Sequence, residues 1–253
     1  MSAPLLEVGH LAKRFGGIVA TDDVSFAIPQ GELHALIGPN GAGKTTLIAQ
    51  LSGSIFADSG AIRFAGTDIT RLTMQKRSHF GLARSFQITS LFLDLSVLDN
   101  VALAVQAHAG HSFSFWRNAR TEAELREPAR EALLRVGLAD RADRLTASLS
   151  HGEHRLLELA MALAGKPRLL LLDEPMAGLG PEESARMVEM LKALKGDYTI
   201  LLVEHDMEAV FALADRISVL VYGRIIATGS PDDIRANAQV REAYLGEAEA
   251  AHV

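Results

Sequence analysis

Short apolar segments dominate the first quarter of the chain. Residues 5–11, 22–28, 33–38 and 61–66 read LLEVGHL, DDVSFAI, LHALIG and AIRFAG, and Gly or Pro lies between them. Runs of this length bounded by turn residues are typical of β-strands. A helical segment separates the third run from the fourth. The pattern predicts an antiparallel β portion with one helix inside it.

The middle of the chain has helical spacing instead. From Ser96 to about Lys166, apolar residues recur among Arg and Glu at intervals of three and four, as at Leu125, Leu133, Leu134, Val136 and Leu138. Residues 109–119 (AGHSFSFWRNA) break this spacing and predict a loop between helices. We therefore expect an inserted helical subdomain at about 88–165.

The last third alternates strands with helices. Strands are predicted at 168–175, 199–205, 216–222 and 224–229, and helices at 181–194, at 207–214 and from Pro231 onward. Strands that are apolar throughout favour a parallel sheet covered on both faces. The predicted fold is α/β, with a mixed β-sheet core, an antiparallel β subdomain and the inserted helical subdomain. It forms a single domain over 1–237, followed by a polar C-terminal tail at 238–253.

Composition and charge limit the cellular compartment and the classes of partner that we expect. The 253 residues, 48% of them hydrophobic, suffice for one large core. The absence of cysteine excludes disulfides and thiolate metal sites and favours a reducing compartment. The N-terminus does not resemble a signal peptide, and no run approaches the roughly 18 apolar residues of a membrane helix. The net charge of −6 gives no overall attraction to nucleic acid, which we do not expect as a partner.

A phosphate-binding motif lies at residues 36–47, LIGPNGAGKTTL. Its spacing matches G-x-x-x-x-G-K-[ST] between a predicted strand and a predicted helix, which disfavours a plain glycine turn. Backbone N–H groups of such a loop point at phosphate oxygens, Lys44 would reach the β and γ phosphates, and the Thr45 hydroxyl would bind Mg²⁺. The candidate nucleotide-binding residues are Gly38, Pro39, Asn40, Gly41, Ala42, Gly43, Lys44, Thr45 and Thr46.

Two acidic residues end the predicted strand LLLLDEP. Carboxylates at the carboxyl end of a parallel strand face the same crevice as the phosphate loop. Asp173 then suits the shell of Mg²⁺, and Glu174 suits polarising a water that attacks the γ-phosphate. The alternative is that the two acidic residues simply begin a solvent-exposed turn. The presence of the phosphate loop disfavours this interpretation.

The stretch SLSHGEHRLLELAMAL, 148–163, is similar to the signature motif of ATP-binding cassette ATPases. Ser150 and Glu153 also have the spacing of a helix capping box, so the residue types alone do not separate the two interpretations. The order of motifs does, since Gln87 in RSFQITSLF resembles the Q-loop of that family, His205 in LLVEHDM its switch histidine, and Phe15 its adenine-stacking aromatic.

The resemblance implies a role for each matched residue. Phe15 would stack on adenine, Gln87 would contact Mg²⁺ and the attacking water, and His205 would hydrogen-bond the γ-phosphate. Ser150, Gly152 and Glu153 belong to a signature that acts in trans, on ATP held by the Walker loop of a second subunit. A monomer is then expected to bind ATP and hydrolyse it poorly.

Two positions depart from the commonest pattern of the family. His151 stands in the signature where glycine is usual, and Gly180 stands in the D-loop where aspartate is usual, which puts communication between the two ATP sites in doubt. Such variation is familiar in the cassettes of branched-chain amino acid importers. The chain resembles the longer, LivG-like type of their two ATPase subunits, in which the region corresponding to 104–130 is expanded.

The resemblance also implies partners. These are a second ATPase subunit, in a homodimer or a heterodimer, transmembrane permease subunits that dock near 88–100, and indirectly a substrate-binding protein. The apolar candidates for docking are Ile88, Leu91, Phe92, Leu95, Val97 and Leu98, although they could instead form the core of the subdomain. The protein would then lie peripherally at the cytoplasmic face of the inner membrane.

Other functions stay open at this stage. Urea import or lipopolysaccharide export would keep the ATPase and change the cargo. A soluble cassette ATPase acting on DNA or ribosomes is disfavoured, because the chain has one phosphate loop, no sustained heptads and no basic tract. A nucleotide kinase would need neither the signature nor the histidine.

Overall fold

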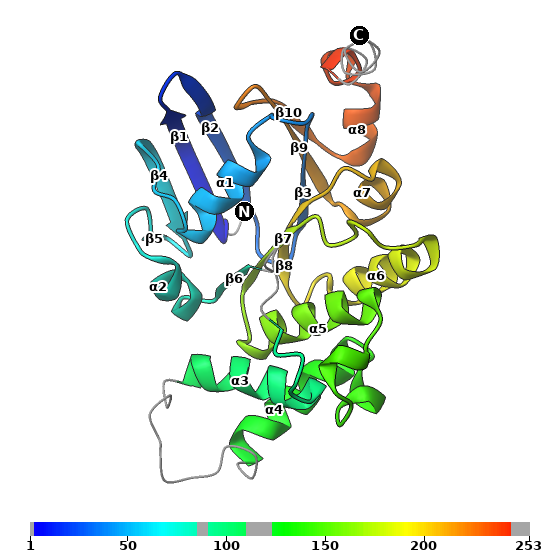
Figure 1. Ribbon diagram of the computed structural model, residues 1–253. Helices are drawn as coiled ribbons and strands as arrows, with labels where there is room; N and C mark the ends of the chain where they lie inside the picture. Colours follow the sequence, from blue (N-terminus) through cyan, green and yellow to red (C-terminus); the bar gives the residue numbers. More distant parts are fainter. Residues whose placement is uncertain (1–2, 85–90, 110–122, 244–253) are drawn as a thin grey trace.

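The computed structural model describes residues 3–84, 91–109 and 123–243. Two β-sheets lie beside each other with helix α1 between them, and a group of helices lies at one end of the molecule (Figure 1). The α/β class and the mixed sheet predicted from the sequence are confirmed.

The first sheet is antiparallel, with four strands in the order β2-β1-β4-β5. These are β1 Leu6–Phe15, β2 Ile18–Ile28, β4 Ser59–Phe64 and β5 Thr67–Asp68. Strands β1 and β2 run beyond the predicted segments because a Gly16-Gly17 turn, with Gly16 at φ 58°, joins Phe15 directly to its partner Ile18 in a tight hairpin.

The second sheet has six strands in the order β10-β9-β3-β8-β7-β6. These are β3 Leu33–Ile37, β6 Leu82–Arg84, β7 Leu169–Asp173, β8 Thr199–Val203, β9 Arg216–Val221 and β10 Arg224–Gly229. All neighbours are parallel except β10, which pairs antiparallel to β9. The carboxyl ends of β3, β7 and β8 therefore meet at one edge.

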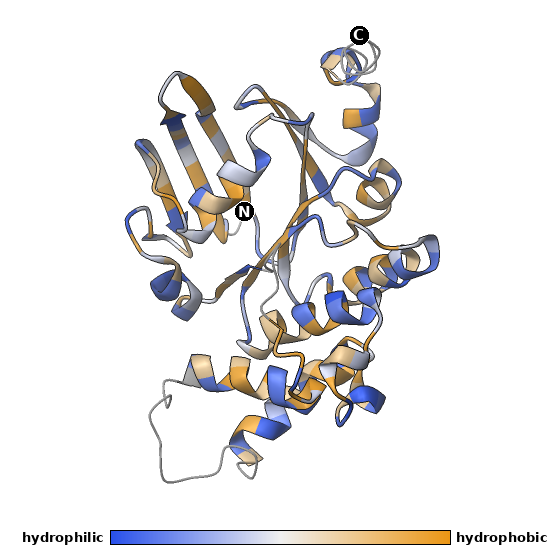
Figure 2. Ribbon diagram, in the orientation of Figure 1, coloured by the Kyte–Doolittle hydropathy of each residue, from blue (hydrophilic) through white to orange (hydrophobic). Residues whose placement is uncertain are grey.

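Alternate residues of the central strands serve two separate cores. Leu169 and Leu171 of β7 pack with the antiparallel sheet and with α1, Lys44–Ser52. Leu170 and Leu172 pack on the opposite face with α6, Pro181–Leu194, and α7, Met207–Leu213. Figure 2 shows the apolar residues concentrated in the strands and on the inward sides of the helices. Both faces of the sheet are thus covered, as the continuous apolar strands predict.

The predicted helical subdomain contains α3, Val97–Ala109, α4, Ala123–Arg135, and α5, His151–Ala164, packed on one another. Short 3-10 turns lie between the last two, η2 at Ala139–Arg141 and η3 at Thr146–Ser148. Apart from Ala109, the predicted loop at 109–119 lies outside the described residues. The subdomain is anchored by the buried Asn100, whose Nδ2 donates to the carbonyls of Phe92 and Ser96 and to Thr146 Oγ1.

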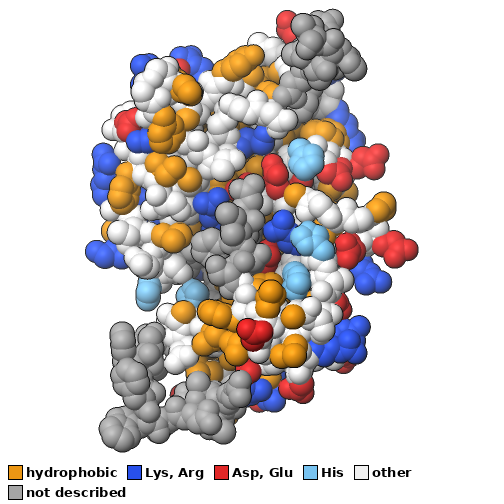
Figure 3. Space-filling model, viewed as in Figure 1, with side chains coloured by type: hydrophobic (Ala, Val, Ile, Leu, Met, Phe, Trp, Pro, Cys, Tyr) orange, Lys and Arg blue, Asp and Glu red, His pale blue; other side chains and the backbone are white. Residues whose placement is uncertain are grey.

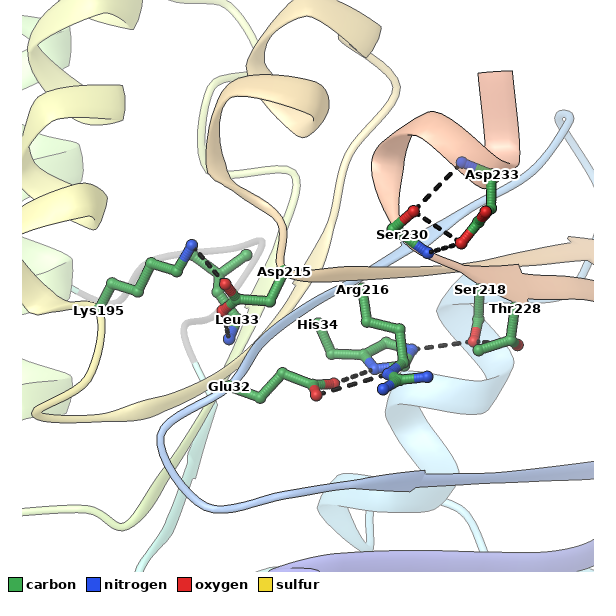
Figure 4. Close-up of polar contacts among 10 residues, drawn as sticks. All are labelled: Glu32, Leu33, His34, Lys195, Asp215, Arg216, Ser218, Thr228, Ser230 and Asp233. Carbon is green, nitrogen blue, oxygen red and sulfur yellow. Dashed lines mark hydrogen bonds and ion pairs between the residues drawn. The ribbon is translucent and has the colours of Figure 1, made fainter. Parts of the chain in front are cut away.

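The C-terminal hairpin is held to β3 by buried polar contacts (Figure 4). His34 has its Nδ1 2.9 Å from Glu32 Oε1 and its Nε2 2.9 Å from Ser218 Oγ, which in turn lies 2.8 Å from Thr228 Oγ1. Asp215 accepts from the N–H of Leu33 at 2.9 Å. Strands β3, β9 and β10 therefore form one unit beneath the loop that follows β3.

Further features differ from the prediction. Helix α2, Met74–His79, was not predicted, because the buried surface of this short polar segment comes from Arg77. After α8, Pro231–Ala236, residues 238–243 are helical, and Val240 is 5% exposed in the core. Val240 lies in the segment predicted as a polar tail, and its apolar side chain packs in the core, while the bound of the domain stays a prediction.

Candidate active site

The loop between β3 and α1 has a shape that its neighbours impose. Gly38, at φ 155°, lies against the carbonyl of Leu220, which a Cβ would approach to 2.0 Å. Gly43, at φ 104°, lies against the carbonyl of Ala20, at 2.1 Å from a Cβ. The buried Ala42 accepts from the N–H of Gly223 at 2.9 Å. The carbonyls of β9 and β2 thus leave room only for glycine at positions 38 and 43, and they fix the conformation of the predicted phosphate loop.

Lys44, the first residue of α1, folds its side chain back over this loop. The side chain is buried, and its ammonium donates to the carbonyl of Gly38 and, at 3.0 Å, to that of Pro39. The first turn of α1 contains no acidic residue, so the positive end of the helix is not neutralised by its own side chains. The loop therefore combines a cation and a helix N-terminus, as an anion site requires.

Asp173 and Glu174 lie at the edge where the parallel strands end. Asp173 is 3% exposed, and its Oδ2 accepts from Arg84 Nη2 at 3.0 Å. Glu174 has φ +50°, unusual for a residue other than glycine, and its N–H donates to the carbonyl of Val203. Strained backbone of this kind persists where surrounding structure enforces it, and it clusters at functional sites.

Arg84 was missed by the sequence reasoning. It ends β6, directly before the segment that carries Gln87, and its guanidinium joins the ion pair with Asp173 while Nη1 lies 3.5 Å from Ser52 Oγ. The one signal available was a basic residue at the end of a short strand. Gln87 itself lies outside the described residues, so its role stays a prediction.

Glu204 was also missed, and it joins two loops of the site. Its side chain is fully buried, with Oε1 accepting from the N–H of Met176 at 2.9 Å and Oε2 from that of His205 at 3.1 Å. Burial raises the pKa of this carboxyl, while the two backbone N–H groups act in the opposite direction. The carboxylate thereby fixes the loop after Glu174 relative to His205, whose side chain is 65% exposed at the same edge.

The start of α5 has the capping box predicted from its sequence. Ser150 Oγ accepts from the N–H of Glu153 at 3.2 Å, and Glu153 Oε2 accepts from the N–H of Ser150 at 2.9 Å. The same carboxylate pairs with Arg141 Nε at 3.0 Å. The Ser150 N–H first, and Arg141 further, lower the pKa of Glu153. The contacts of Glu153 are structural, and ligand binding by it stays a prediction.

The predicted site residues fall into two groups. Lys44 begins α1, Asp173 ends β7 and His205 follows β8, all at one edge of the parallel sheet. Ser150 and Gly152 lie instead at the start of α5 in the helical subdomain (Figure 1). Phe15, at the end of β1, is 47% exposed with the Lys13 ammonium 5.4 Å from its ring centroid. The chain does not join its own phosphate loop and signature into one site.

Oxygen donors for a hard cation are present at the first group. The Thr45 hydroxyl and the Asp173 carboxylate belong to α1 and β7, which pack against each other, and both are ligand types that suit Mg²⁺. Within residues 3–84, 91–109 and 123–243 there is no cluster of three His, Cys, Asp or Glu side chains fit for a metal ion. Such a donor set fits an ion that is shared with phosphate oxygens rather than caged by protein.

Family models match two parts of the chain. The model described as ABC transporter matches residues 21–177. The model described as branched-chain amino acid ATP-binding cassette transporter matches residues 224–250.

Curated relatives align over almost the whole chain. The high-affinity branched-chain amino acid transport ATP-binding protein BraF of Pseudomonas aeruginosa is 38% identical over 255 residues, covering 98% of this chain and 100% of the relative. LivG of Escherichia coli K12, which carries the same description, is equally similar with the same coverage. A sulfate/thiosulfate import ATP-binding protein, CysA 2 of Chromobacterium violaceum, is 38% identical over 234 residues, but the alignment covers 59% of that relative.

Solved structures share the fold. The ADP conformation of MJ1267, an ATP-binding cassette of an ABC transporter, superimposes with a TM-score of 0.86 at 29% identity, over 97% of this chain and 100% of that one. A nucleotide-free ATP-binding cassette from an ABC transporter superimposes with a TM-score of 0.84 at 29% identity, over 96% of this chain and 99% of that one.

Proposed function

The chain belongs to the ABC transporter ATP-binding family, and from that premise we propose that it is the ATP-hydrolysing subunit of an importer for branched-chain or related amino acids. The observation that carries the cargo class is the end-to-end 38% identity to BraF and LivG. The match at 224–250 to the branched-chain family model supports the same class from a separate part of the chain.

The chemistry proposed for the site is hydrolysis of ATP. The backbone N–H groups of the loop 38–46, Pro39 excepted, and the Lys44 ammonium hold the phosphates, and Phe15 stacks on adenine. Thr45, Asp173 and Gln87 hold Mg²⁺, which when bound neutralises charge on the phosphates. The residue set fits this chemistry, because Lys44 already places its ammonium among the loop carbonyls of Gly38 and Pro39.

Glu174 and His205 act on the reacting groups in this proposal. The Glu174 carboxylate orients a water and takes its proton as the water oxygen bonds to the γ-phosphorus and the bond to the β–γ bridging oxygen breaks. His205 donates a hydrogen bond to the γ-phosphate. The buried Glu204 holds these two residues in register through Met176 and the His205 N–H, since its carboxylate accepts from both loops.

A second cassette completes the site. Because Ser150 and Gly152 lie in another part of the chain from the phosphate loop, we propose that they meet the γ-phosphate bound by a partner cassette, and that two ATP molecules close the dimer. Hydrolysis and product release then shift the population back to the open form.

The permease contact is proposed at the start of the helical subdomain. Phe92 and Leu93 are 55% and 50% exposed, and hydrophobic side chains gather over this subdomain on the face shown in Figure 3. Val97 and Leu98, predicted as docking candidates, are fully buried in the core and do not line this surface, because they form the first turn of α3. Ile88 lies outside the described residues.

The proposed permease contact also implies where in the cell the protein acts. Among the helices that the structure describes, not one has the length and apolarity to cross a membrane. We propose a peripheral position at the cytoplasmic face, reached through the permease subunits and coupled indirectly to a substrate-binding protein.

A pull-down of tagged protein from detergent-solubilised native membranes, with mass spectrometry of the recovered chains, tests the assignment. Two permeases, a second cassette and an amino acid binding protein are expected. Recovery of a urea or lipopolysaccharide permease would change the cargo. Recovery of ribosomal or DNA-repair proteins without any permease would refute transport.

A further inference from the structure

A carboxylate of the same chain lies on the signature. Glu183, in the first turn of α6, accepts at Oε1 from the Ser150 hydroxyl at 3.3 Å and from the N–H of Gly152 at 3.2 Å. Its Oε2 accepts from the N–H of Gly180 at 3.4 Å. One anionic group therefore serves the beginnings of both α5 and α6, which lie side by side in Figure 1.

The two departures from the family pattern lie at this contact. Gly180 is the N-cap of α6 and has no side chain to cap the helix, and the Glu183 carboxylate accepts from its N–H. A Cβ on Gly178 would lie 3.4 Å from the Nε2 of His151, which places the imidazole against the D-loop. A Cβ on Gly152 would meet Glu183 Oε1 at 2.5 Å, so the absence of a side chain there admits the carboxylate.

The donors that Glu183 engages are those assigned above to ATP. The Ser150 hydroxyl and the Gly152 N–H each have a single hydrogen to donate, and a phosphate oxygen and a carboxylate oxygen cannot share it without strong repulsion. We infer that Glu183 holds the signature donors in the single cassette and has to release them before the γ-phosphate of the partner's ATP can bind. The inference rests on the proposed function, because it takes the trans action of the signature as given.

The contact of Glu183 with the signature should raise the ATP concentration at which the two cassettes close. In a cassette without a nucleotide-bearing partner, the carboxylate accepts from one backbone N–H at the start of each helix and keeps the signature donors occupied. Closing the dimer exchanges this anion for phosphate and displaces Glu183 from two donors. After hydrolysis and phosphate release the carboxylate returns, which favours the open state. Because the hydrogen bonds are long and are exchanged rather than lost, we expect an effect of about tenfold on the ATP concentration for closure.

The test measures ATP-dependent dimerisation by light scattering after gel filtration, in a Glu174→Gln background that slows hydrolysis. Glu183→Gln removes the charge and keeps the size of the side chain. Glu182→Gln makes the same charge change one residue away, on an exposed side chain in the same first turn of α6. The midpoint in ATP is expected to fall about tenfold for Glu183→Gln and to stay within about twofold for Glu182→Gln.

A structural role alone would give a different result. Loss of a capping contact that merely holds α5 and α6 together would leave the midpoint unchanged or raise it, and either outcome overturns the inference. Glu183→Asp keeps the charge and shortens the reach, and a smaller fall in the midpoint is expected from it, so the inference remains testable if the Gln variant folds poorly. Failure of the parent itself to dimerise with ATP would overturn the proposed function and, with it, the inference.

Discussion

Removal of the Arg77 guanidinium should destabilise the whole domain. The side chain is 0% exposed and donates to four carbonyls, those of Gln50 at 2.6 Å, Leu51 at 2.7 Å, Thr70 at 2.9 Å and Leu72 at 2.9 Å. The first two belong to the last turn of α1, so a cation caps the negative end of the helix that begins at Lys44.

The magnitude follows from the carbonyls left behind. The carbonyl of Gln50 keeps the N–H of Gly53, at 3.3 Å, as a donor. An unsatisfied buried acceptor costs about 1–3 kcal/mol, so the carbonyls of Leu51, Thr70 and Leu72 in Arg77→Met give about 3 kcal/mol at the low end. Burial lowers the pKa of the guanidinium to about 10, and this desolvation, removed by the substitution, is why the low end applies. Arg77→Lys keeps a charge without the planar fork, and we expect about 2 kcal/mol.

Urea denaturation gives the free energy of unfolding directly, with Arg63→Met as the control. Arg63 is exposed on β4 and its loss should change that free energy by less than about 0.5 kcal/mol. Calorimetry of ATP binding provides a second measurement, since a loosened α1 should also weaken nucleotide affinity. Equal stability of Arg77→Met and Arg63→Met would refute the reasoning, because three buried carbonyls would then have found other partners at no cost.

Three further predictions concern the site. Lys44→Ala should weaken ATP binding about 10- to 100-fold in calorimetry, because the phosphates lose a charged donor, and unchanged affinity would remove the assigned role of the loop. Glu174→Gln should bind ATP, lose turnover and accumulate as an ATP-dependent dimer, whereas wild-type hydrolysis rates would contradict its role as base. Glu153→Gln should cost about 1 kcal/mol of stability at pH 7, because it weakens the bonds from the Ser150 N–H and from Arg141 Nε. Since the pKa of Glu153 is lowered in the folded state, its contribution is present above the ordinary value of about 4.5 and is lost as pH falls through the folded pKa. Urea titrations should therefore show the two proteins converging in acid, and a constant gap would contradict the assignment.

Elements with local signals at both ends were predictable from the sequence. Helix α6 begins at Pro181 after Gly180 and ends at Leu194, as predicted, because Pro at the first position and acids in the first turn are signals carried by the helix itself. Strand β10, Arg224–Gly229, was likewise predicted with both bounds. The capping box of Ser150 and Glu153 follows from a spacing of three residues.

Elements that depend on distant partners were not predictable. Helix α2 has the sequence MQKRSH, with no apolar period, and Arg77 is its buried residue because other elements supply the carbonyls. Strand β6 has three residues that pair with β7, far along the chain. Local composition carries little information about either, since long-range packing decides both.

The candidate site likewise contains features that local sequence predicts and features that depend on distant residues. The phosphate loop and the acids of β7 have motif spacing that sequence reasoning can read. The pair of Arg84 with Asp173 spans 89 residues, and that of Ser150 with Glu183 spans 33, so the folded topology creates both. In the sequence, Glu204 is an ordinary acidic residue before a histidine. Only the folded structure shows that it is buried and accepts from two backbone N–H groups.

The close approach of Gly38 to Leu220 and of Gly43 to Ala20 has a consequence for biosynthesis. The loop that receives phosphate is encoded near residue 40, yet one of the two walls that shape it is strand β9, Arg216–Val221, and the N–H that holds Ala42 comes from Gly223. A ribosome has to release more than four-fifths of the chain before that wall can form, given its 253 residues. We therefore expect nucleotide affinity to arise late in translation, and a truncated cassette that lacks the hairpin to bind ATP more weakly than the full chain.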